Sequence, residues 1–167
     1  MSVTYRLHQF IRALTARISY SEHRVVVQQL THGQLRLFES MPRFDQRHCL
    51  DVYYTLVHGG YDDTMLLQAA LIHDCGKVDD NGNRIPLIYY GVFVILKRLA
   101  PAMYEQAARH GKGIFRPFAV HAMHELRSAL LAEAVGSPIE VVTILHEYAA
   151  RQITTQTQAL AWADERN

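Results

Sequence analysis

The chain has 167 residues, of which 49% are hydrophobic and 20% are charged, and its net charge is +1. This length favours one compact domain, and the hydrophobic content excludes a disordered chain. The near-neutral charge argues against a nucleic-acid polymer or a membrane surface as the partner. The longest apolar run, Ile85 to Leu96, is shorter than the roughly 20 residues that span a bilayer. With two cysteines and no disulfide framework, we expect a cytoplasmic protein.

Clusters of glycine, proline and polar residues divide the chain into segments in which apolar residues recur every three or four positions. We expect two or three helices between Val3 and Ser40. The next helix is expected over Asp45 to His58, with Asp45 placed to cap its first turn. Two glycines, at 59 and 60, are placed to end it.

The segment Thr64 to Cys75 is apolar nearly all round, which is typical of a central helix surrounded by other helices. Later helices are expected over Leu87–Leu99, Ala102–His110, Phe118–Val135, Ile139–Ala149 and Thr155–Arg166. The β-branched runs at 25–27 and 92–95 do not alternate with polar residues, so neither is assigned as a strand. The sequence therefore predicts an all-α fold, a single-domain helical bundle.

The strongest local signal lies at the end of this central helix, where the chain reads His73-Asp74-Cys75-Gly76-Lys77. Imidazole nitrogen and carboxylate oxygen together suit a divalent ion. Gly76 suits a helix stop with positive φ, and Lys77 then follows as a charge available to an anion. For an isolated His-Asp pair, a helix end followed by a solvated lysine is the alternative interpretation.

Other histidines and an aspartate border the apolar faces of their helices. These residues are His48, His124, His146 and Asp164, each four positions from an apolar residue. One such residue alone is typical of a hydrogen-bonded core position. Several helices that offer one each are what a metal site between helices needs, because ligands on separate rigid elements must converge. On the helix that carries both His121 and His124, the pattern favours His124.

The order of these residues resembles the HD-domain superfamily of metal-dependent phosphohydrolases, in which a histidine precedes a His-Asp-x-Gly-Lys motif and an aspartate follows much later. The resemblance covers residues 44–167 as an HD metal-binding helical domain and leaves residues 1–43 as accessory N-terminal helices. It implies that one divalent ion is bound by His48, His73, Asp74 and Asp164. His124 and His146 are similar to the extra histidines with which some members bind a second ion.

The same resemblance implies a small-molecule phosphate substrate, a nucleotide among the candidates, and one or two ions of Mn, Mg, Fe, Co, Ni or Zn. An ion of this kind activates a water molecule. Asp74 and Lys77 are the catalytic candidates, with Lys77 on the open side of the ion, where it would bind the phosphate. A cyclic dinucleotide is not expected, because residues 147–151 read Glu-Tyr-Ala-Ala-Arg where that branch has Gly-Tyr-Pro.

Two other functions stay open at this point. The ligand order also resembles the mixed-valent di-iron oxygenases of the HD fold, which cleave C–C or C–P bonds with O₂. A non-catalytic module that binds a nucleotide or a partner protein through a degenerate HD site is the third candidate. Lys77 favours hydrolysis over the oxygenase reaction, because a free cation suits a phosphate substrate.

Overall fold

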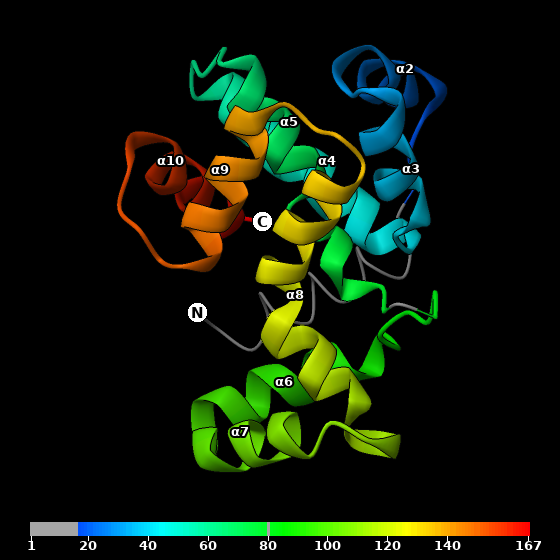
Figure 1. The fold of residues 1–167 in the computed structure, drawn as a ribbon, viewed down its shortest axis with the longest axis vertical. Coiled ribbons are helices and arrows are strands. Elements are labelled where there is room, and N and C mark those ends of the chain that lie inside the picture. Colours follow the sequence, from blue (N-terminus) through cyan, green and yellow to red (C-terminus); the bar gives the residue numbers. More distant parts are fainter. Residues whose placement is uncertain (1–16, 80) are drawn as a thin grey trace.

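The computed structural model describes residues 17–79 and 81–167, and these residues form nine α-helices (Figure 1). The all-α fold predicted from the sequence is therefore confirmed. The helices before the central one are α2 (Tyr20–Gln29), α3 (His32–Ser40) and α4 (Arg43–His58). The central helix α5 (Thr64–Ile72) is followed by the 3-10 turn η1 (Cys75–Lys77). The remaining elements are α6 (Ile88–Leu99), α7 (Pro101–His110), η2 (Gly113–Phe115), α8 (Arg116–Ala134), α9 (Ile139–Ala149) and α10 (Thr155–Asp164).

Helix α5 lies at the centre of the main core, as its apolar composition predicts. Every residue from Leu66 to Ile72 is buried. Helices α2, α3, α4, α9 and α10 all pack against it. Among the helices that the structure describes, none is long and apolar enough to cross a membrane.

Helices α2 and α3 belong to the same core. Val26 of α2 and Phe38 of α3 are fully buried within it. The Gln34 side chain donates to the side-chain oxygen of Gln68 at 3.0 Å, and Gln68 donates to the Gln29 carbonyl at 2.8 Å. The boundary between residues 43 and 44 stays a prediction, and the part of the accessory segment before residue 17 lies outside the described residues.

A second, aromatic cluster packs α6 and α7 against the first turns of α8, at the lower end of the molecule in Figure 1. The rings of Phe93 and Phe118 lie 5.0 Å apart, edge to face, and Tyr104 packs on both. Helix α8 then continues into the main core, where Ala129 and Ala132 are fully buried. This helix therefore joins the two clusters.

The predicted role of Asp45 as a helix cap is wrong. Helix α4 begins at Arg43, after Pro42, and no side chain caps it. Asp45 lies in the first turn, 2% exposed, where it accepts hydrogen bonds from Tyr90 and Lys77. The carboxylate is needed inside the protein as the partner of a buried cation, so it is not available to the helix terminus.

The predicted reason for Gly76 is also wrong. Its φ is not positive, and it lies inside η1. A Cβ at this position would lie 2.1 Å from the His124 carbonyl oxygen and 2.7 Å from the Ser128 nitrogen, both backbone atoms of α8. The Gly76 N–H donates to Ser128 Oγ at 2.8 Å. Glycine is required here because the backbone of η1 touches α8.

We therefore expect Gly76→Ala to lower the free energy of unfolding by about 1–3 kcal/mol, because backbone atoms of α8 must move away. Gly91→Ala is the matched control. Gly91 lies in α6 with nothing within 4 Å of an added Cβ, so alanine there should raise stability by up to about 1 kcal/mol. Urea unfolding measures both. Equal stability of the two variants would contradict the close contact between η1 and α8.

Candidate metal centre

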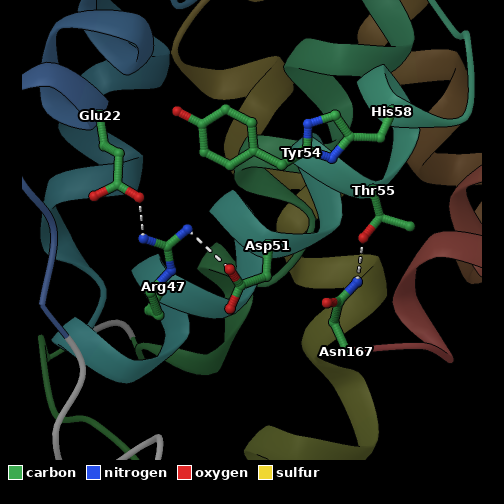
Figure 2. Close-up of a pocket in the computed structure, with 7 residues that line it drawn as sticks. All are labelled: Glu22, Arg47, Asp51, Tyr54, Thr55, His58 and Asn167. Atoms are coloured by element: carbon green, nitrogen blue, oxygen red, sulfur yellow. Dashed lines mark hydrogen bonds and ion pairs between the residues drawn. The ribbon is translucent and has the colours of Figure 1, made fainter.

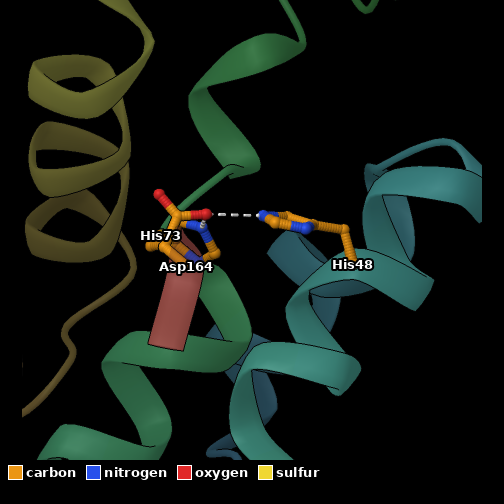
Figure 3. Close-up of side chains that lie close together, drawn as sticks. All are labelled: His48, His73 and Asp164. Carbon is orange, nitrogen blue, oxygen red and sulfur yellow. Dashed lines mark ion pairs between the residues drawn. The ribbon is translucent and has the colours of Figure 1, made fainter. Parts of the chain in front are cut away.

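The structure brings three of the residues predicted for the first ion together, His48, His73 and Asp164, and sets the fourth, Asp74, beside the two histidines. His48 projects from α4, His73 and Asp74 follow the last residue of α5, and Asp164 is the last residue of α10. Figure 3 shows the His48 ring directed at the Asp164 carboxylate, with His73 beside it. Residues separated by more than 100 positions in the sequence thus face one point.

The spacing of the donor atoms fits a single ion. His48 Nε2 lies 2.9 Å from Asp164 Oδ1, and His73 Nε2 lies 3.7 Å from the same oxygen. The three ligand atoms are all within 4.8 Å of one another. Two ligands about 2.1 Å from one ion at a tetrahedral angle are about 3.4 Å apart, so these separations suit a shared cation.

Asp74 faces the same point. Its Oδ1 lies 3.8 Å from His73 Nε2, and its Oδ2 lies 3.7 Å from His48 Nε2. The side chain of Asp74 is 3% exposed, whereas that of Asp164 is 31% exposed. The centre is therefore closed on the Asp74 side and open on the Asp164 side.

The orientation of His73 is the most informative feature of the centre. Its Nδ1 lies 2.8 Å from the Ala70 carbonyl oxygen, to which it donates. The other nitrogen, Nε2, is buried and has no hydrogen-bond partner among the described residues. An unsatisfied buried nitrogen is costly. A ring held by a backbone carbonyl with its free nitrogen directed at carboxylates is the arrangement of a metal-binding histidine.

Both carboxylates are in the charged form that a metal ligand needs. Burial raises the pKa of Asp164, but the hydrogen bond from His48 and the nearby His73 ring outweigh it and lower that pKa below its usual range. Burial likewise raises the pKa of Asp74, and the Lys77 ammonium outweighs it, so the Asp74 pKa lies well below its usual range.

The predicted position of Lys77 on the open side of the ion is wrong. Lys77 is buried, and its Nζ forms ion pairs with Asp74 and, at 3.4 Å, with Asp45. The Tyr90 hydroxyl donates to Asp45 Oδ2 at 3.2 Å. Two buried carboxylates need a buried cation, and Lys77 supplies it. Lys77 therefore holds Asp74 in place from the protein interior and is not exposed to a substrate.

The structure places His124, and not His121, against Asp74. His124 Nε2 lies 3.4 Å from Asp74 Oδ1, and its Nδ1 lies 2.5 Å from the His121 carbonyl oxygen. The His121 ring packs on Phe93 instead, with its Nδ1 2.6 Å from the Tyr104 hydroxyl. Burial, and then the neighbouring His124, lower the pKa of His121 to about 2.

The second-ion role of His146 stays a prediction. It lies half-buried in α9. In the part of the chain that the structure describes, two groups of candidate ligand atoms lie within 4.8 Å of one another, and His146 belongs to neither. His58, which the pattern sets on the polar side of α4, is exposed.

Sequence reasoning missed Tyr148, which supports Asp164. The Tyr148 hydroxyl donates to Asp164 Oδ2 at 2.8 Å, and its ring lies edge-on to His73, 6.4 Å between centroids. Burial, and then the Asp164 charge, raise the Tyr148 pKa, so the hydroxyl keeps its proton. The signal available in the sequence was the buried face of α9, which Tyr148 shares with Ile144 and Leu145.

A surface depression beside the centre is occupied by paired charges (Figure 2). Its lining residues are Glu22, Arg47, Asp51, Tyr54, Thr55, His58 and Asn167. The Arg47 guanidinium lies 2.5 Å from Glu22 and 2.9 Å from Asp51. These charges compensate one another, and none of the residues predicted as metal ligands lines the depression.

No family model, curated protein or solved structure matches this chain. The function of this chain is therefore inferred from the geometry of the centre and from the resemblance of the motif.

We expect divalent ions to raise the melting temperature through these ligands. A ligand at 100 times its dissociation constant stabilises a protein by about 2.7 kcal/mol, or roughly 5–10 °C for a chain of this size. The shift should be lost in His73→Ala and in Asp164→Asn, and it should remain in His58→Ala, whose ring is exposed. Thermal melts with Mn²⁺ and with chelator measure this. Loss of the shift in His58→Ala alone would place the ion elsewhere.

We expect Lys77→Met to leave Asp74 and Asp45 without their cation, which should cost about 3–5 kcal/mol of unfolding free energy in chelator. Excess Mn²⁺ should restore part of it, because a divalent ion also neutralises Asp74. Lys112→Met is the control, since Lys112 is exposed and should change stability by less than about 0.5 kcal/mol. If Lys77→Met unfolds in chelator like the parent, the buried ion network does not hold the centre.

Proposed function

We propose that this chain is a metal-dependent phosphohydrolase of the HD-domain type, which uses one or two divalent ions to hydrolyse small-molecule phosphate esters. The observation that carries the proposal is the buried, unpartnered Nε2 of His73, which faces Asp164 together with His48. Two imidazoles with two carboxylates suit Mn, Fe, Co, Ni or Zn better than an all-oxygen site would.

The residues of the centre have separate tasks in this proposal. When bound, the ion lowers the pKa of its water toward about 7 and so provides the nucleophile. His48, His73, Asp74 and Asp164 would hold it. Tyr148 fixes Asp164 through Oδ2 and leaves Oδ1 toward the histidines.

Asp74 also faces His124, through the oxygen that faces His73. This position supports His124 as a ligand of the predicted second ion. Lys77 is a positioning residue, because it acts through Asp74 and Asp45. Because Lys77 is buried, it is not available to a phosphate and no longer favours hydrolysis over the oxygenase reaction. The proposal therefore depends on the imidazole and carboxylate donors, among them Nε2 of His73.

The experiment is to strip the protein with chelator, reload it with single metals and assay hydrolysis of 4-nitrophenyl phosphate and nucleoside 5′-monophosphates. We expect no activity without metal and recovery with Mn²⁺ or Co²⁺. His48→Ala and Asp164→Ala should lower the rate by about 10²-fold or more, since each removes a ligand. His58→Ala should keep it.

Other outcomes would contradict the proposal in distinct ways. Copurified iron with visible absorption and O₂ consumption would favour the oxygenase. Hydrolysis that persists in chelator would separate the activity from this centre. Protein that binds a nucleotide but turns over nothing with any metal would favour the non-catalytic module.

A further inference from the structure

We propose that Arg151 binds a second anionic group of the substrate, so that this centre prefers molecules carrying two separated phosphates to those carrying one. The inference deepens the proposed function and rests on it for the reacting phosphate. The binding of the second phosphate can be measured without turnover.

The backbone of Arg151 is in the left-handed conformation. Its φ is +57°, and it is the one non-glycine residue with positive φ in the part of the chain described. The Arg151 N–H bonds to the Tyr148 carbonyl at 3.1 Å, and the Gln152 N–H bonds to the Glu147 carbonyl at 2.9 Å. This pair of bonds ends a helix with a left-handed residue, which is usually glycine. A long side chain at a position that favours glycine points to a use for that side chain.

The Arg151 guanidinium contacts Tyr148 and Glu125. Its carbon is 5.8 Å from the centroid of the Tyr148 ring, and its Nη2 is 2.9 Å from Glu125 Oε1. The Tyr148 hydroxyl donates to Asp164, and Glu125 directly follows His124. Both groups that hold the guanidinium are thus attached to residues of the metal centre.

The guanidinium is accessible and has donors left. The Arg151 side chain is 71% exposed, and its ion pair within the described residues uses Nη2. Arginine has five N–H donors in a planar fork that matches phosphate. The Asp164 side of the centre is also the more open side. Arg151 therefore stands where a substrate enters.

The separation between Arg151 and Asp164 determines what it can bind. The guanidinium lies over the Tyr148 ring, and the hydroxyl of the same ring reaches the Asp164 carboxylate. A phosphoryl group at the ion is smaller than this ring, so the guanidinium is left for another anionic group of the same molecule. Two phosphates on different hydroxyls of one sugar have such a separation.

A second cation, Lys97, interacts electrostatically with Glu125 and Arg151. Lys97 of α6 has its Nζ 5.0 Å from the Tyr104 ring. Burial lowers the Lys97 pKa, the Glu125 charge raises it and the Arg151 charge lowers it further. Lys97 therefore adds positive charge that acts on Glu125, the partner of Arg151.

The test uses adenosine 3′,5′-bisphosphate and adenosine 5′-monophosphate as probes, titrated calorimetrically into the manganese-loaded protein. The parent should bind the bisphosphate about tenfold or more tightly, as expected of a charge-assisted contact. Arg151→Ala and Arg151→Gly should bind the two probes alike, and Arg151→Lys should recover part of the preference. Arg109→Ala is the control, because Arg109 is equally exposed and pairs with Glu105 on α7.

A stability measurement separates this role from a structural one. Arg151→Gly should melt about 2–4 °C above Arg151→Ala, because only glycine relieves the left-handed backbone. A parent that binds both probes equally, or variants that keep the preference, would overturn the inference. Preferential binding without hydrolysis of either probe would uphold Arg151 and contradict the proposed function.

Discussion

The elements around the candidate centre are arranged to neutralise the buried charge of Asp74. Its carboxylate is almost fully removed from solvent, and a buried charge must be paired. Lys77 provides that pairing, and Asp45 and Tyr90 complete the network from α4 and α6. The requirement to neutralise one carboxylate thus ties the aromatic cluster to the metal centre. A divalent ion in front of Asp74 would add a second compensation and would give the buried Nε2 of His73 a partner.

The contact between η1 and α8 gives the centre its shape. Because Gly76 has no side chain, η1 lies directly on the α8 backbone, with its N–H on Ser128 Oγ. One turn earlier on α8, His124 then reaches the Asp74 carboxylate. The same close approach that packs the core thereby brings a fifth candidate ligand to the site. One glycine thus allows both this packing and the approach of His124 to Asp74.

Local patterns were enough to predict the helices and the approach of His48, His73 and Asp164 to one another, because helical period and motif order indicate which faces turn inward. They were not enough for Gly76, Asp45 or Lys77. Each of these depends on a partner more than 30 residues away, on α8 for Gly76 and between Asp45 and Lys77 for the other two. A charged residue after a helix end is usually solvated, and only the tertiary structure shows that Lys77 is not. The helical periodicity of α8 was enough to favour His124 over His121. The role of His146 depends on the position of a second ion, which periodicity does not give.

Anomalous diffraction from crystals grown with Mn²⁺ would show whether His48, His73, Asp74 and Asp164 bind one divalent ion. We expect a peak about 2.0–2.6 Å from Nε2 of both histidines and from an oxygen of each aspartate. A peak confined to the depression lined by Glu22 and Asp51, or none at saturating Mn²⁺, would contradict it.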